Sequence, residues 1–200
     1  MTTSPRVRMS PANRREQLLE LGVRLLATRP IDEISIELLA EQAGISRGLL
    51  YHYFGNKQDF HRAVVRRAAD DLIEVTAPTE DEDPLQQLML SLGAYVDYVS
   101  QNYQGYVSLV RAASTDEALR EIYEQARAAL TDRLFDVAGR DRLAELGITD
   151  SAATRLMVRG WSALTEEVVI SWVRSPQGIT REELLQRLAH GLVALVQPPG

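Results

Sequence analysis

The stretch "AEQAGISRGLLYHYFGNKQDF", residues 40–60, contains two short helical patterns separated by a tight turn. Gly44 follows the first pattern, and glycine readily adopts the left-handed backbone conformation that ends a helix. Ser46 then precedes the second pattern, where its hydroxyl oxygen can accept a backbone N–H of the first turn. Two short helices joined in this way are typical of a helix-turn-helix motif.

The second helix of such a motif enters the major groove of DNA with its N-terminal residues facing the base edges. The sequence places Arg47, Gly48 and Leu49 at this position. Gly48 lowers helix stability, which we interpret as allowing the backbone to come close to a phosphate or a base. Leu50 and Phe54 are four residues apart and are expected to point back into a helical core.

Polar side chains beside this helix are candidates for phosphate contacts. A phenol or an imidazole can hydrogen-bond phosphate oxygens, although an ordinary surface position is the alternative for the imidazole of His52. Lys57, the only lysine in the chain, starts the next helix, where unpaired backbone N–H groups already favour an anion. Arg47 is the candidate for base readout. The complete set of predicted DNA-binding residues is Ser35, Ser46, Arg47, Gly48, Leu49, Tyr51, His52 and Lys57.

Charge is distributed unevenly along the chain. The 200 residues have a net charge of −6, but residues 1–67 contain eleven Lys and Arg against seven Asp and Glu, a local charge of +4. Residues 68–200 therefore carry −10. A basic head on an acidic body favours a small DNA-binding domain fused to another domain. A solvated charged face is the alternative explanation.

Apolar residues recur at helical spacing throughout the chain, and no alternating pattern bounded by hairpin turns is present. We therefore predict an all-α fold of about nine helices. Capping patterns mark several helix starts: Ser10-Pro11, Ser35, Asn56, Asp83-Pro84 with Gln86, Ser114 with Glu117, and Thr180 with Glu183. The predicted helices span residues 10–28, 36–43, 46–53, 56–76, 84–101, 103–112, 115–138 (closed by Gly139), 150–174 and 180–196.

The segment "APTEDEDP", residues 77–84, is acidic, polar and flanked by proline, which indicates a domain boundary. We predict a helix-turn-helix DNA-binding domain over 10–76, made of three helices and a connecting helix. A second helical domain is predicted over 84–197.

Residues 35–60 resemble the N-terminal pattern of the TetR family of bacterial transcriptional regulators. The resemblance covers about residues 14–65 and is carried by Ser35, Leu39-Ala40, Ala43-Gly44, Ser46, Leu50-Tyr51, Tyr53-Phe54, Asn56-Lys57 and Phe60. One departure is Glu37, where family members often carry arginine or another polar residue. Phosphate repels an acid, so we expect no phosphate contact from the first helix of the motif beyond Ser35. The resemblance implies a ligand-responsive regulator, in the first instance a repressor, that binds a palindromic operator in double-stranded DNA as a dimer and is released by a small molecule.

The second domain contains aromatic and polarizable side chains on several helices. Core filling explains each of them singly, but together they can line a mostly apolar pocket for an unknown small-molecule effector. We expect this site between the helices predicted over 84–101, 103–112, 115–138 and 150–174. The predicted lining residues are Tyr95, Tyr98, Arg111, Tyr123 and Trp161.

The last two predicted helices carry apolar residues on more than one face, and an additional apolar face needs a partner. In similar proteins these helices form a four-helix bundle with their two-fold mates. We therefore predict a homodimer through residues 150–196, using Leu156, Leu164, Val168, Val169, Leu184, Leu188, Leu192 and Leu195.

Other classes of protein find no positive support in the sequence. The chain has no cysteine, which excludes disulfides, thiolate metal sites and cysteine nucleophiles. It has no Gly-x-Ser-x-Gly elbow, and His52 and His61 do not share a helical face, so we predict no catalytic residues, no metal site and no cofactor. No apolar run reaches the roughly eighteen residues of a membrane span, and no secretory signal is recognised, so a cytoplasmic location is expected. A purely structural helical adaptor would leave the recognition helix unexplained.

Overall fold

The computed structural model describes residues 10–77, 83–145 and 147–197. Over these ranges the chain forms nine α-helices and one turn of 3₁₀-helix, with no strand, which confirms the all-α prediction. None of the described helices combines the length and apolar character that crossing a membrane requires. The elements are α1 (Pro11–Thr28), η1 (Ile31–Glu33), α2 (Ile36–Ala43), α3 (Arg47–Phe54), α4 (Lys57–Val75), α5 (Pro84–Gln101), α6 (Tyr103–Ala113), α7 (Glu117–Glu145), α8 (Ala152–Arg174) and α9 (Arg181–Val196).

Capping side chains start most of the helices. At five of the predicted caps a side-chain oxygen accepts the backbone N–H three residues further on; these residues are Ser10, Ser35, Ser46, Asn56 and Thr180. Asp116 and Ser151, which were not among the predicted caps, do the same at the starts of α7 and α8. At Asp83 the prediction is wrong, because its side chain makes no capping hydrogen bond and Pro84 alone marks the start of α5.

The predicted start of α7 and its capping residue are wrong. The Ser114 hydroxyl donates backwards to the Arg111 carbonyl (2.6 Å) and leaves α7 uncapped by that residue. The carboxylate of Asp116, which lies directly before the helix, instead accepts the N–H groups of residues 118 and 119 at 2.9 and 3.1 Å. Gly139 has non-helical backbone angles (φ 67°, ψ 159°) and ends the first helical segment of α7, as predicted; a second segment follows and continues to Glu145.

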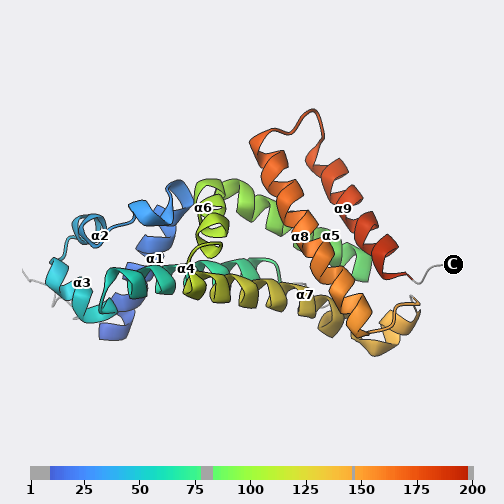
Figure 1. Ribbon diagram of the computed structural model, residues 1–200, viewed down its shortest axis with the longest axis horizontal. Coiled ribbons are helices and arrows are strands. Elements are labelled where there is room, and N and C mark those ends of the chain that lie inside the picture. Colours follow the sequence, from blue (N-terminus) through green and yellow to red (C-terminus); the bar gives the residue numbers. More distant parts are fainter. Residues whose placement is uncertain (1–9, 78–82, 146, 198–200) are drawn as a thin grey trace, which may run out of the picture.

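The helices form an elongated molecule with a head at one end (Figure 1). The head consists of α1, α2, α3 and the first turns of α4. From there α4 runs towards the middle of the molecule, where α7 lies alongside it. At the far end α5, α8 and α9 pack together with the second half of α7, and α6 lies between this body and the head.

Apolar packing of the head continues into the body. The head core is formed by side chains such as Leu26, Leu50, Phe60 and Val64, and it also includes Leu119 and Ile122 of α7. The head core therefore extends across the predicted domain boundary. Residues 78–82 of the predicted connector lie outside the described residues.

The helix α6 packs closely against α1 of the head. A Cβ atom at Gly105 would lie 1.9 Å from the backbone oxygen of Leu26, so only glycine fits at this crossing. One turn further on, the Ser108 hydroxyl oxygen accepts the backbone N–H of Ile31 in η1 at 3.0 Å. The 3₁₀ turn between α1 and α2 is thereby fixed to the body.

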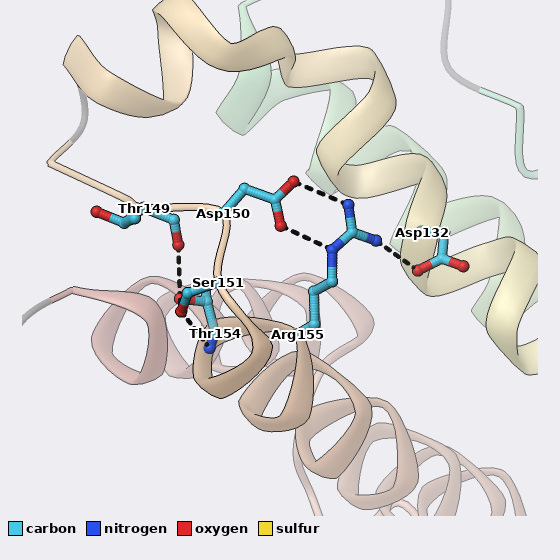
Figure 2. Close-up of polar contacts among 6 residues, drawn as sticks. All are labelled: Asp132, Thr149, Asp150, Ser151, Thr154 and Arg155. Carbon is cyan, nitrogen blue, oxygen red and sulfur yellow. Dashed lines mark hydrogen bonds and ion pairs between the residues drawn. The ribbon is translucent and has the colours of Figure 1, made fainter.

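A charged cluster joins the start of α8 to α7 (Figure 2). The Arg155 guanidinium donates two hydrogen bonds to Asp150 (2.7 and 2.9 Å) and one to Asp132 (2.9 Å). Its central carbon lies 4.5 Å from the centroid of the Phe135 ring, within the range of a cation–π contact. This arrangement holds the α7–α8 connection against the body.

The crossing at Gly105 predicts a large and specific loss of stability. In Gly105→Ala the added methyl group has to displace the α1 backbone, so we expect the free energy of unfolding to fall by about 1–3 kcal/mol or more. Gly48→Ala is the matched control, since it places the same methyl group in a helix with no atom nearer than 4.0 Å. Urea denaturation followed by circular dichroism should show Gly48→Ala as neutral or stabilised; equal losses in both variants would contradict this account.

Candidate nucleic-acid interface and ligand cavity

The turn between α2 and α3 has the predicted backbone geometry. Gly44 is left-handed (φ 62°, ψ 38°), and the N–H of Ile45 donates to the carbonyl of Ala40 at 3.0 Å, closing α2. The Ser46 oxygen then accepts the N–H of Leu49 at 3.3 Å and starts α3. The helix-turn-helix predicted from this stretch is confirmed.

One face of α3 is buried and the other is open to solvent. Leu50 and Phe54 lie in the head core, and Tyr53 is half-buried against it. The exposed face carries the candidate DNA-binding residues of this helix, which are Arg47, Gly48, Leu49, Tyr51 and His52. The structure thus presents them together on one surface, while their contacts with DNA stay predictions.

Glu37 pairs with the candidate base-reading residue. Its Oε1 lies 3.5 Å from Nη1 of Arg47, and both side chains are more than half exposed (56% and 67%). The carboxylate that departs from the family pattern is therefore a neighbour of the guanidinium at the start of α3. Arg47 is tethered towards α2, and an exposed pair of this kind is weak enough to rearrange when DNA approaches.

Lys57 lies at the start of α4 beside the 3₁₀ turn. Its ammonium group donates to the backbone carbonyl of Asp32 at 3.1 Å, and among the described residues no carboxylate lies within ion-pairing distance of it. This contact directs the ammonium group without neutralising its charge. The capping oxygens of Ser35 and Ser46 accept backbone N–H groups, which leaves each hydroxyl proton able to donate to a phosphate.

His61 has a structural role. Its Nε2 atom lies 2.7 Å from the carbonyl oxygen of Ile34, and burial lowers the pKa of the imidazole below its ordinary value. Within the described part of the chain, no three His, Cys, Asp or Glu side chains gather in a way that suits a metal ion.

A cavity of about 140 Å³ lies within the body. Its walls come from α5, α6, α7 and α8, the four helices between which the site was predicted, and from Thr76 at the end of α4. We call it the polar cavity, because hydroxyl, carboxylate and guanidinium groups interrupt its apolar wall. Its lining residues are Thr76, Pro84, Gln87, Leu88, Ser91, Leu92, Tyr95, Tyr106, Arg127, Leu130, Thr131, Arg133, Leu134, Val137, Trp161, Ser162, Thr165 and Glu166.

A hydrogen-bonded network is built around the buried carboxylate of Glu166. The Tyr123 hydroxyl lies 2.8 and 2.7 Å from its two oxygens, and the Tyr106 hydroxyl lies 3.5 Å from one of them. The Tyr106 hydroxyl also lies 2.9 Å from that of Tyr95, and Arg127 donates to the Tyr123 hydroxyl at 3.0 Å. Burial raises the pKa of Tyr123 to about 12 and those of Tyr95 and Tyr106 further above the ordinary value. The three phenols are therefore neutral at physiological pH.

Two groups of the polar cavity, the Thr165 hydroxyl and the Arg133 guanidinium, differ in their hydrogen bonds. Thr165 is only 4% exposed, and its hydroxyl has no hydrogen-bond partner among the described residues. A buried hydroxyl without a partner is costly, and a ligand can supply one. Arg133 donates to the carbonyl of Ile73 at 2.9 Å. This bond connects the cavity wall to the last turn of α4.

The predicted ligand-binding residues divide into three groups. Tyr95 and Trp161 line the polar cavity, and Tyr123 stands behind the wall as a partner of Glu166. The placement of Tyr98 is wrong, because its position on α5 turns it towards α4, where its hydroxyl donates to the carbonyl of Ala68 at 2.9 Å. The placement of Arg111 is also wrong, since five residues of helix separate it from the cavity-lining Tyr106 and turn it to the exposed side of α6.

Sequence reasoning missed Arg127, Thr165 and Glu166. Thr165 lies midway between two buried residues of α8, Trp161 and Val169, at four-residue intervals, and Glu166 is its neighbour. The position of Glu166 next to this row of buried residues could have identified it from the sequence. Arg127 follows Tyr123 by one helical turn, which places the two side chains on one face of α7.

Part of the predicted dimer surface is exposed and part is internal. Leu156 and Leu164 on α8 are 55% and 53% exposed, and Leu195 on α9 also faces solvent. Five further residues named for this surface are instead packed in the chain's own core, where α8 and α9 meet the rest of the body: Val168, Val169, Leu184, Leu188 and Leu192. The assignment of Val169, Leu184, Leu188 and Leu192 to the dimer interface is wrong, because they are buried within the chain. Val168 is only partly buried, and its place at the interface stays a prediction.

Comparisons with known proteins agree with this geometry. Residues 18–64 match bacterial regulatory proteins of the tetR family, and residues 84–195 match the tetracyclin repressor-like C-terminal domain. The chain is 24% identical over 182 residues to the transcriptional activator FasR of Mycolicibacterium smegmatis, covering 90% of this chain and 81% of that protein. It is 34% identical over 67 residues to the transcriptional repressor KstR2 of the same organism, covering 34% of this chain and 33% of that one.

A solved structure extends the match to nearly the whole chain. The tetR-family transcriptional regulator from Streptomyces coelicolor is 31% identical, covers 94% of this chain and 82% of its own, and superposes with a TM-score of 0.78. The second family match alone takes in more than half of the 200 residues. The chain therefore belongs to the TetR family and is a DNA-binding transcriptional regulator without enzymatic activity.

Proposed function

We propose that this regulator is a repressor that binds a palindromic operator as a homodimer and is released by a small molecule. One observation carries the proposal: two elements that form the polar cavity also hold the DNA-binding head. Thr76 and Arg133 connect the cavity to α4. Tyr106 lines the cavity from α6, the helix whose Gly105 and Ser108 contact α1 and η1.

The exposed face of α3 supports the DNA-reading part of the proposal. Arg47 is the residue that we assign to base readout, ideally at a guanine edge, and Lys57 holds a phosphate through an un-neutralised ammonium group. One helix-turn-helix makes few such contacts, and members of this class usually bind in pairs to two half-sites. The exposed leucines of α8 and α9 supply the apolar surface for the pair.

Release follows from the spacing between the two heads. Half-sites on one face of DNA lie about 34–36 Å apart or at a multiple of that distance. A ligand that moves the end of α4 or shifts α6 changes the distance between the two copies of α3, and phosphate contacts are lost at both half-sites. The ligand can weaken DNA binding only by the factor by which it binds the DNA-free conformation more tightly than the DNA-bound one. Because the relatives above include both an activator and a repressor, repression is the part of the proposal that most needs testing.

A footprint on the DNA flanking the protein's own gene tests the function as a whole. We expect protection of a two-fold symmetric site that overlaps the promoter, and reduced transcription of a reporter placed behind it. Compounds that raise the melting temperature should be added to the same footprint. If compounds stabilise the protein yet none of them removes the protection, the cavity is a binding site but the switch is not present.

Substitutions at Arg47 and Lys57 should have separable effects. Lys57→Ala removes one phosphate contact per half-site, so operator and unrelated DNA should both bind more weakly, and the slope of log K against log salt should flatten by about 0.9 per contact. Arg47→Ala should cost about 1–3 kcal/mol of discrimination per half-site. Fluorescence anisotropy over a salt series measures both quantities. A change of sequence preference in Lys57→Ala would contradict its assignment to phosphate.

The ion pair between Glu37 and Arg47 predicts a gain in affinity coupled to a loss of selectivity. Glu37→Gln removes a carboxylate that repels phosphate, so binding to unrelated DNA should become tighter. It also removes the tether of Arg47, so the ratio of operator to unrelated affinity should fall. Glu41→Gln, an exposed acid on the same helix, is the charge-matched control. If both variants lower the ratio equally, the pair has no orienting role.

The dimer prediction rests on the exposed leucines of α8. Leu164→Arg places a charge in the centre of the proposed interface, and we expect a monomer that has lost operator binding while its circular dichroism spectrum is unchanged. Leu90→Arg on α5 is the control, because Leu90 is similarly exposed (50%) but lies outside residues 150–196. Light scattering coupled to gel filtration distinguishes the two; a wild-type monomer at micromolar concentration would overturn the prediction.

A further inference from the structure

A second cavity adjoins the polar cavity. It has a volume of about 530 Å³ and lies between α5, α7, α8 and α9. Apart from Asp83 and Gln197, every residue that lines it is apolar, and we call it the apolar cavity. Pro84, Leu88 and Leu134 line both cavities, so the two spaces are separated by no more than shared side chains.

The far end of the apolar cavity is firmly held. Phe135 and Ile148 form part of its wall. The Arg155 guanidinium lies against the Phe135 ring and is fixed by Asp150 and Asp132 (Figure 2). These contacts join the start of α8 to α7 beside the cavity wall.

The charges of the polar cavity favour an anion. Its lining has three side chains of charged residue types: two arginines, Arg127 and Arg133, and one acid, Glu166. The carboxylate already accepts hydrogen bonds from tyrosine. The two guanidinium groups donate only to neutral oxygens within the described residues, Arg127 to the Tyr123 hydroxyl and Arg133 to a backbone carbonyl. An anionic group makes the lining neutral, while a cation would add a third positive charge. The Thr165 hydroxyl can donate to the same anion.

We propose that the effector is an elongated molecule with a carboxylate head in the polar cavity and an unbranched hydrocarbon tail that passes Leu88 and Leu134 into the apolar cavity. This inference rests on the proposed function, because it assigns a chemical class to the effector of that function. A compact ligand fills only the polar cavity. A long chain gains from both, since each methylene removed from water strengthens binding by about fourfold.

The length of the tail is tested with straight-chain carboxylic acids of increasing length, each below its critical micelle concentration, by titration calorimetry without DNA. For the wild type we expect affinity to rise with every added methylene until both cavities are filled. Val193→Trp fills only the apolar cavity, and Leu88→Trp blocks the shared wall, so in both variants the rise should stop at a shorter chain. Leu90→Trp, which lines neither cavity, should behave as the wild type.

The head group is tested with alcohols and amines of the same chain length. The carboxylate should bind most tightly and the amine most weakly. Arg127→Gln removes one charge-assisted hydrogen bond, so the affinity for the carboxylate should fall about tenfold. The affinity for the alcohol should not change. Glu166→Gln should strengthen the carboxylate, because it removes the only acid of the lining. Melting temperature and operator binding confirm that each variant is folded.

Several outcomes would overturn the inference. If the wild type reaches its maximum affinity at the same chain length as Val193→Trp, the tail does not enter the apolar cavity, and that surface serves another occupant such as a second copy of the chain. If the amine binds best, or the carboxylate and alcohol bind equally, the head group is wrong. If no acid binds but other compounds release the operator, the inference fails and the proposed function stands. If the protein binds no operator, the proposed function fails. The calorimetry contains no DNA, so its result on the effector is independent of that failure.

Discussion

The crossing of α6 over the end of α1 is the constraint on which the arrangement of head and body depends. The backbones approach so closely that a single methyl group at Gly105 has no room, and the Ser108 bond to η1 lies one turn away. The interiors of proteins repack between discrete arrangements and do not deform continuously. A helix in contact with backbone on one side and with the cavity through Tyr106 on the other has to move as a unit. The head is therefore joined to the body through α6 and α4, and also through the start of α7, whose Leu119 and Ile122 lie in the head core.

The buried carboxylate of Glu166 constrains the packing of the body helices. A carboxylate that is only 9% exposed requires hydrogen bonds to compensate for lost hydration. Tyrosines from α6 and α7 provide them, and a third tyrosine from α5 bonds to the first. Four helices thus meet at one polar group, which specifies how they pack. The same demand leaves the cavity with oriented hydroxyl groups beside an apolar wall, the combination that selects ligands by both shape and polarity.

The sequence predicted what short-range chemistry determines. The turn at Gly44, five of the caps and the nine helices all depend on residues within one or two turns of each other. The errors lie where distant segments decide. Tyr98 and Arg111 sit on helices that were placed correctly, but the rotation of each helix about its axis is fixed by packing against other helices. At Ser114 two nearby oxygens competed for the start of α7, and the outcome depended on a geometry that spacing alone does not contain.

The carboxylate of Glu37 beside the recognition helix also bears on the kinetics of target search. A regulator meets millions of wrong sites for every right one, and the time spent on each is governed largely by charge attraction to phosphate. In the proposed mode of DNA binding, the acid that pairs with Arg47 at 3.5 Å weakens that attraction wherever no base edge draws the guanidinium away. Each visit to an incorrect sequence becomes shorter. A residue that lowers overall affinity in this way lets a small number of molecules survey a genome faster.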